Sequence, residues 1–165
     1  MLQERARFGP RLDPEAVLPA AGLCAADADL RVPVQVVSTG VAQVLVPLAA
    51  EQALARARPD WPAIEALLDE HEAIVLYLAY CDLDVGRART RAFTHSADMG
   101  EDPATGSAAG PLAAYLHART GVAQLEVRQG EEMGRPSRLE CAIDGDRVRV
   151  GGGVAVVLDG TVRLP

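Results

Sequence analysis

Residues 100–121 read GEDPATGSAAGPLAAYLHARTG, and this stretch decides the fold. From Leu112 to Arg119 the composition is nearly all small and apolar, and Gly121 follows as a residue type that commonly ends a helix. A helix that lacks a clear polar face is usually buried. We therefore predict a helix through the centre of the molecule with strands wrapped around it. Pro111 removes one backbone hydrogen bond, so the helix is expected to start late or to bend there.

The residues just before this helix predict a site for a small anion. Glu101 and Asp102 precede the turn-forming run Thr105-Gly106-Ser107. A helix start aims free backbone N–H groups at whatever lies in front of it, and small residues let a ligand approach the backbone. Two adjacent acids there could cap the turn, hold an ammonium group or move a proton. On local grounds alone, Asp102 is equally explained as an N-cap and Ser107 as a first-turn residue.

Apolar runs rich in valine and leucine predict the surrounding strands. These runs are residues 32–37, 41–48, 73–80, 88–94, 124–129, 138–143, 147–150, 154–158 and 161–164. Ser38-Thr39-Gly40, Asp144-Gly145-Asp146 and Asp159-Gly160 separate successive runs and indicate hairpin turns. The expected fold class is α+β, a mixed or antiparallel half-barrel around a central helix.

Two shorter helices and a linker complete the predicted organisation. Residues 49–57 and 60–70 have helical patterns, with Asp60 as the N-cap of the second. Residues 1–31 are rich in proline and glycine and indicate a linker with a short helix near residues 13–21. The chain is therefore predicted to hold one folded lobe, from residue 32 to 165.

Composition limits the classes of function. The 165 residues are 49% hydrophobic and carry a net charge of −7. A core of ordinary size is expected, while no block of Lys and Arg offers a footprint for nucleic acid or an anionic membrane. The N-terminus has no apolar leader and no run reaches membrane-spanning length, so we expect a cytoplasmic location. A small ligand or a protein partner is favoured.

The three cysteines indicate neither a disulfide framework nor a metal site. Cys24, Cys81 and Cys141 are odd in number and far apart, without a CxxC pattern. We interpret them as buried thiols, and no metal is expected.

Residues 101–108, EDPATGSA, resemble the hallmark of the phenazine-biosynthesis (PhzF-like) isomerases, relatives of diaminopimelate epimerase. Matching motifs follow the order of that family's second half. They are Val37-Ser38-Thr39-Gly40, Arg91-Ala92-Phe93, Gln129-Gly130, Met133-Gly134-Arg135-Pro136-Ser137 and Val150-Gly151-Gly152. The resemblance implies one lobe of a two-lobed protein whose active site lies in the cleft between the lobes. The family's catalytic glutamate and a companion histidine sit in the other lobe, and no stretch of this chain matches them.

The resemblance also implies roles for the site residues. The positions matching Asp102, Gly106 and Ser107 line the family's substrate site, with the aspartate on a polar substituent and the other two on a carboxylate. Thr105 belongs to the same turn and is included as a binding residue. Asp102, Glu101 and His95 are the candidate acids or bases of this chain. The family works without a metal or organic cofactor.

The roles of Gln129 and Arg135 stay open, because each side chain could clamp a carboxylate or hydrogen-bond to loop carbonyls.

Three functional hypotheses follow. In the first, the chain is one subunit of a split isomerase that a separate N-terminal lobe completes. In the second, it pairs with itself as a homodimer. In the third, it is a non-catalytic binding or interaction module, including a truncated relic. In the first two the substrate is a small carboxylate, and an uncovered cleft face predicts a dimer or larger assembly.

Overall fold

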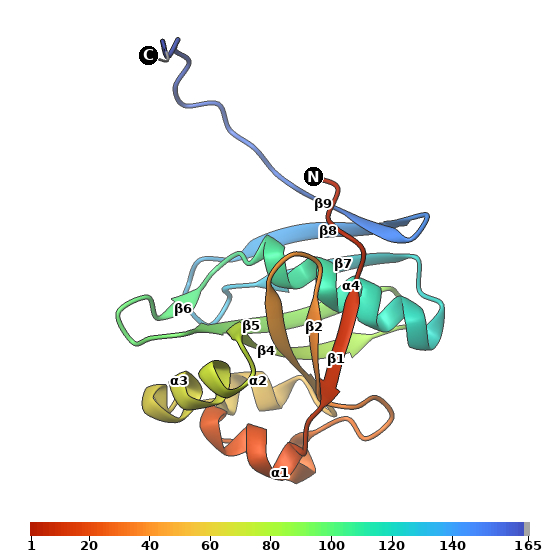
Figure 1. Ribbon diagram of the computed structural model, residues 1–165, viewed down its shortest axis with the longest axis vertical. Helices are drawn as coiled ribbons and strands as arrows, with labels where there is room; N and C mark the ends of the chain where they lie inside the picture. Colours follow the sequence, from red (N-terminus) through yellow and green to blue (C-terminus); the bar gives the residue numbers. More distant parts are fainter. Residues whose placement is uncertain (164–165) are drawn as a thin grey trace.

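A central helix, α4 (Gly106–Thr120), organises the fold, and residues Ala108–Leu116 within it are all buried. In the computed structural model, which describes residues 1–163, the strands curve around this helix (Figure 1). The predicted central helix is thus confirmed, and Gly121 ends it in the left-handed conformation. The expected late start is not observed. The helix begins at Gly106 and runs through Pro111. The missing N–H of Pro111 leaves the Ser107 carbonyl without its usual helical donor.

A nine-stranded mixed sheet surrounds α4. Its strands are β1 (Arg7–Arg11), β2 (Gln35–Ser38), β3 (Ala42–Leu48), β4 (Ala73–Asp82), β5 (Arg87–Thr94), β6 (Glu101–Asp102), β7 (Gln124–Gln129), β8 (Ser137–Asp144) and β9 (Arg147–Gly152). Their order is β1-β2-β3-β4-β5-β7-β8-β9, and β6 pairs with β5. Among the strands of residues 1–163, only the pairs β3–β4 and β5–β7 are parallel, and helices connect both pairs, as parallel strands require. This arrangement confirms the predicted α+β half-barrel.

The first residues of the chain join the two ends of this sheet. Leu2 bridges Arg149 of β9, and the Gln3 N–H donates to the Val148 carbonyl at 2.9 Å. A few residues later, β1 pairs antiparallel with β2. We call residues 1–11 the N-terminal strap, because they cross from one edge of the half-barrel to the other.

The outer face of the sheet carries a second core built from short helices. These are α1 (Pro14–Val17), η1 (Leu18–Ala21), η2 (Ala25–Asp27), α2 (Gln52–Arg56) and α3 (Trp61–Glu70). Asp60 caps α3 as predicted, accepting from the Ala63 N–H at 3.3 Å. No helix within residues 1–163 is long and apolar enough to cross a membrane.

Residues 1–31 do not form the linker that their composition predicted. Val17, Leu18 and Ala21 are buried in the second core together with Ile64 of α3. The prolines do not break this segment, because Pro14 and Pro19 occupy first-turn positions where no backbone donor is needed. The segment therefore packs as part of the lobe.

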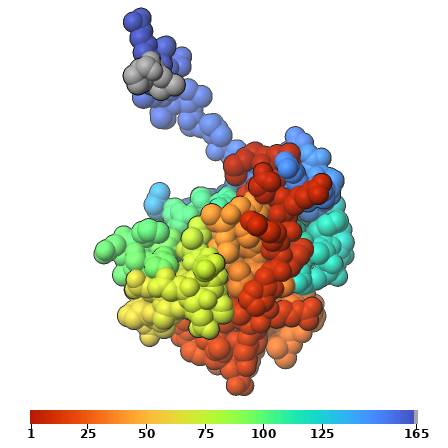
Figure 2. All heavy atoms as spheres, viewed as in Figure 1, coloured from red at the N-terminus to blue at the C-terminus, as the bar shows by residue number. Residues whose placement is uncertain are grey.

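The final predicted strands are absent from the described residues. Residues 153–163 carry no regular structure and extend away from the body, as Figure 2 shows. Residue 164, the end of the last predicted strand, lies outside the described residues. An isolated strand has no neighbour to pair its backbone groups, so an apolar pattern alone does not produce one.

The buried amide of Gln43 allows a prediction about the stability of the fold. It is fully buried on β3, and among residues 1–163 neither its side-chain nitrogen nor its oxygen has a hydrogen-bond partner. Because a buried unsatisfied amide costs about 1–3 kcal/mol, Gln43→Leu is expected to raise the free energy of unfolding by about 1 kcal/mol in urea titrations. Gln35→Leu is the control and should lower it, since the Gln35 amide donates to the Gly9 carbonyl at 2.8 Å. A loss of stability in Gln43→Leu would contradict this account.

Candidate functional site

The start of α4 is left uncapped, and this makes it a candidate binding site. The Thr105 hydroxyl does not cap the helix but donates to the Asp102 carboxylate at 2.7 Å. Among the described residues, the backbone N–H groups of Gly106 and Ser107 and the Ser107 hydroxyl have no hydrogen-bond partner. Free first-turn donors at the positive end of a long helix are suited to a carboxylate. Asp102 is held beside them and stays partly exposed.

Gln129 is the side chain that holds this turn together. It is 1% exposed at the end of β7. Its amide nitrogen donates to the Asp102 carbonyl at 2.6 Å and to the Thr105 hydroxyl at 2.8 Å. Its amide oxygen accepts from the Thr105 N–H at 3.3 Å and the Tyr77 hydroxyl at 3.0 Å. Burial raises the pKa of Tyr77, so that its hydroxyl keeps the proton it donates.

The structure answers the question left open for Gln129, and for Arg135 it gives a backbone contact. Gln129 bonds the backbone and side chains of the site turn. Arg135 contributes through its backbone, since its N–H donates to the Gly130 carbonyl at 2.9 Å, while its residue is exposed. The Gln129 side chain is therefore engaged within the site turn and is not a carboxylate clamp.

The loop after β7 packs tightly against the site turn. Gly130 has a φ of +81°, and a Cβ there would lie 2.3 Å from the Arg135 carbonyl oxygen and 2.9 Å from that of Pro103. The Ser137 hydroxyl donates to the same Pro103 carbonyl at 2.6 Å. Only glycine fits this approach, which explains the Gln129-Gly130 pair.

The two adjacent acids point to opposite faces of β6. Asp102 is paired with Ala92, which packs under α4, whereas Glu101 is paired with Phe93, which belongs to the second core. Alternation along a strand requires this separation. The predicted pair of acids is therefore not one functional unit.

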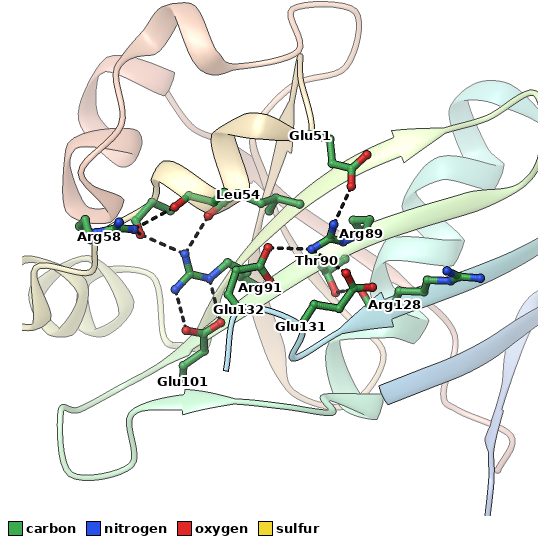
Figure 3. Close-up of polar contacts among 12 residues, drawn as sticks. Glu51, Leu54, Arg58, Arg89, Thr90, Arg91, Glu101, Arg128, Glu131 and Glu132 are labelled. Atoms are coloured by element: carbon green, nitrogen blue, oxygen red, sulfur yellow. Dashed lines mark hydrogen bonds and ion pairs between the residues drawn. The ribbon is translucent and has the colours of Figure 1, made fainter. Parts of the chain in front are cut away.

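The Glu101 carboxylate forms an ion pair with the Arg91 guanidinium (Figure 3). The Arg91 guanidinium donates twice to the carboxylate, at 2.8 and 2.7 Å, and to the carbonyls of Leu54 and Ala57 at 2.8 and 3.0 Å. The side chains of Arg91 and Glu101 are 8% and 13% exposed. This two-pronged contact joins β6 to the C-terminal end of α2.

His95 is also directed away from α4, toward helix α3. Its Nε2 atom is 2.7 Å from the Asp69 carboxylate on α3. Of the three candidate acids and bases, Asp102 is thus the one whose side chain bonds to residues at the start of α4. Thr105, Gly106, Ser107 and Asp102 are brought together as the sequence predicted, whereas Glu101 and His95 are directed elsewhere.

Gln3, which sequence analysis did not single out, supports the same helix. Its amide nitrogen donates to the Gly106 carbonyl at 2.9 Å, and its oxygen accepts from the Thr39 hydroxyl at 2.5 Å. A Cβ on Gly110 would lie 1.7 Å from that oxygen. Gln3 is 103 positions from Gly106, so no local pattern could have revealed the contact.

The cysteines are distributed differently from the prediction that all are buried. Cys141 is buried and Cys81 partly so, but Cys24 is exposed because it precedes a short surface helix, η2. Burial raises the pKa of both Cys81 and Cys141 to about 12, which keeps them as neutral thiols near pH 7. Within residues 1–163, no group of three or more His, Cys, Asp and Glu side chains is arranged to hold a metal ion.

A hollow on the sheet lies apart from the candidate site. A hollow of about 590 Å³ lies on the strands β5, β7, β8 and β9. It is lined by residues such as Arg87, Glu126 and Arg138, and the residues at the start of α4 do not line it. A ligand at the start of α4 would therefore not occupy this hollow.

A buried helix inside a curled mixed sheet, with an uncapped helix start at its rim, defines a lobe of the α+β half-barrel class. The sequence matches the family described as phenazine biosynthesis-like protein over residues 10–160, so the chain belongs to this family. Among the relatives, the trans-2,3-dihydro-3-hydroxyanthranilate isomerases of Pseudomonas aeruginosa and Pseudomonas chlororaphis are 38% and 35% identical over 122 and 146 residues. The matches cover 72% and 82% of this chain.

Solved structures agree with this assignment. A protein described as a predicted epimerase from Pseudomonas aeruginosa is 37% identical, with a TM-score of 0.73 over 92% of this chain. A PhzF-family protein from Bacillus anthracis has the same fold, with a TM-score of 0.78 at 24% identity. The chain spans about half the length of the relatives it matches, 41% and 50% of the two isomerases and 54% of the predicted epimerase.

Proposed function

We propose that this chain is the substrate-binding half of a cofactor-independent isomerase that shifts a proton on a small carboxylate. The observation that carries the proposal is the uncapped start of α4. There the Gly106 and Ser107 N–H groups have no partner among residues 1–163 and lie near a carboxylate, Asp102, that Thr105 holds in place. Membership of a family that contains isomerases supports it.

In this mechanism the lobe binds and orients the substrate. The Gly106 and Ser107 N–H groups bind its carboxylate and stabilise the negative charge that develops beside it, at the positive end of α4. Asp102 accepts a hydrogen bond from a polar substituent. A base removes the proton from one carbon and returns it to another, and we infer from the family resemblance that this base is a glutamate of the partner lobe. No metal or organic cofactor is needed for such a proton shift.

Completion of the site requires a second wall in this proposal, because the family resemblance implies an active site in a cleft between two lobes. A separate N-terminal lobe or a second copy of this chain would provide it. The alternative function is binding of a small carboxylate without turnover. One observation favours this alternative, namely that the other two candidate acids and bases, Glu101 and His95, are engaged with Arg91 and Asp69.

The two functions are separated by proton exchange in deuterated water. The chain is mixed with the first half of the Pseudomonas aeruginosa isomerase, and trans-2,3-dihydro-3-hydroxyanthranilate is followed by NMR. We expect deuterium at carbon only when both halves are present. Saturable binding by the mixture with no exchange would remove the isomerase proposal and leave the binding function.

Substitution of the binding residues supplies a further prediction. Asp102→Ala and Ser107→Ala are each expected to weaken binding of the same compound about tenfold by calorimetry, because each removes about one hydrogen bond to a charged or polar group. Asp98→Ala, an exposed acid in the loop before β6, is the control and should bind normally. Unchanged affinity in both site variants would exclude this pocket.

A further inference from the structure

One arginine on the outer face of β5 gathers three carboxylates from two separate segments of the chain (Figure 3). The Arg89 Nη1 atom lies 2.6 Å from a carboxylate oxygen of Glu51, just before α2. Its Nη2 atom lies 2.7 Å from Glu132 and 3.1 Å from Glu131. Exposed ion pairs contribute little, but the Arg89 side chain is only 26% exposed and joins several charges, the case in which such contacts matter. Without this cation, three negative charges would face one another.

Two of these carboxylates belong to residues 130–136, which we call the β7–β8 loop. The loop is closed by its own hydrogen bonds. The Gly134 N–H donates to the Glu131 carbonyl at 3.0 Å, and the Met133 N–H donates to the Gly130 carbonyl at 3.2 Å. A displacement of the two acids is therefore passed on to Gly130, at the start of the loop.

The other side of the β7–β8 loop packs on the candidate site. Gly130 approaches the backbone of Pro103, the residue after Asp102, so closely that a Cβ would not fit. Gln129, directly before the loop, accepts from the Thr105 N–H at 3.3 Å. The loop thus lies between the guanidinium of Arg89 and the turn that begins α4.

We propose that Arg89 is a positioning residue of the candidate site, because its ion pairs with the two acids of the β7–β8 loop hold that loop against the site turn. The inference rests on the proposed binding of a small carboxylate at the start of α4. Arg89 touches no substrate in this account and acts through the loop. A guanidinium suits the role, since its fixed fork of donors bonds partners on two sides at once.

Hydrogen exchange in the ligand-free chain tests the positioning directly. The Thr105 N–H is protected by its buried hydrogen bond to Gln129, whereas the amide of Leu112, in the middle of α4, reports opening of the whole lobe. We expect Arg89→Met to accelerate exchange at Thr105 about fivefold more than at Leu112, because the loosened loop frees the turn without unfolding the helix.

Arg87→Met is the matched control for this measurement. Arg87 lies on the same strand and the same face as Arg89, but its ion-pair partner at 3.7 Å is Glu126 of β7, outside the loop. This variant should leave the ratio of the Thr105 and Leu112 exchange rates unchanged.

Affinity gives the second readout, measured by calorimetry with trans-2,3-dihydro-3-hydroxyanthranilate where the variants are folded. Arg89→Met should weaken binding about fivefold. The pair Glu131→Ala with Glu132→Ala should weaken it equally, and adding Arg89→Met to that pair should cause no further loss, since the contact is already absent. Glu51→Gln should change affinity less than twofold, because it leaves the loop contacts of Arg89 in place.

Three results would overturn the proposal. Equal acceleration at Thr105 and Leu112 in Arg89→Met, or unchanged affinity of this variant when the unmodified chain binds, would leave Arg89 with a stabilising role only. Additive losses in the triple variant would show that Arg89 acts by another route than the loop. If the unmodified chain does not bind the compound, the proposed function fails, whereas the exchange comparison still decides whether Arg89 positions the turn.

Discussion

Arg91→Met is expected to lower the free energy of unfolding by about 3–5 kcal/mol, the cost of leaving the charge of a buried ion pair without its partner. Glu101 would keep its carboxylate at 13% side-chain exposure with no guanidinium beside it. The carbonyls of Leu54 and Ala57 would lose donors as well. Urea denaturation followed by circular dichroism measures the change.

The double variant Arg91→Met with Glu101→Leu is the decisive control. Replacing both members of a buried pair with apolar side chains is often neutral or stabilising, so the double variant should recover most of the lost stability. It should also bind the small carboxylate as the unmodified chain does, because neither side chain faces α4. A loss of binding in the double variant would return Glu101 to the functional site.

Gln129→Leu is expected to affect both stability and binding. The substitution leaves the Thr105 N–H, the Tyr77 hydroxyl and the Asp102 carbonyl without their buried partner. At about 1–3 kcal/mol for each unsatisfied group, partly relieved by rearrangement, the loss in unfolding free energy should be about 3 kcal/mol. The released turn no longer holds Asp102, so affinity for the small carboxylate should fall about tenfold.

Gln124→Leu gives a matched comparison on the same strand. Gln124 lies at the exposed start of β7, and its replacement should change neither quantity appreciably. Stability and affinity of Gln129→Leu are measured by urea denaturation and calorimetry under conditions where the variant is folded. If affinity were unchanged while stability fell, Gln129 would be a core residue with no part in positioning the site.

Local sequence determined the elements that build this lobe. The apolar composition from Leu112 to Arg119 predicted a buried central helix, and the turn at Ser38-Thr39-Gly40 predicted the hairpin between β2 and β3. The run from Asp102 to Ser107 placed the candidate site, because capping and helix-start chemistry depend on residues within one turn of each other. These features need no distant partner, so a single stretch of chain is enough to predict them.

The tertiary structure alone decided how these residues work together. It separated Glu101 from Asp102, since neighbours on a strand face opposite ways, and it brought Gln3 and Gln129 to the helix start from distant parts of the chain. It turned a proline-rich segment into core and left an apolar one, residues 153–163, exposed. The physical reason is common to all of these cases. A strand pairs, a polar group is satisfied and an apolar face is buried only when another part of the structure supplies the complementary surface.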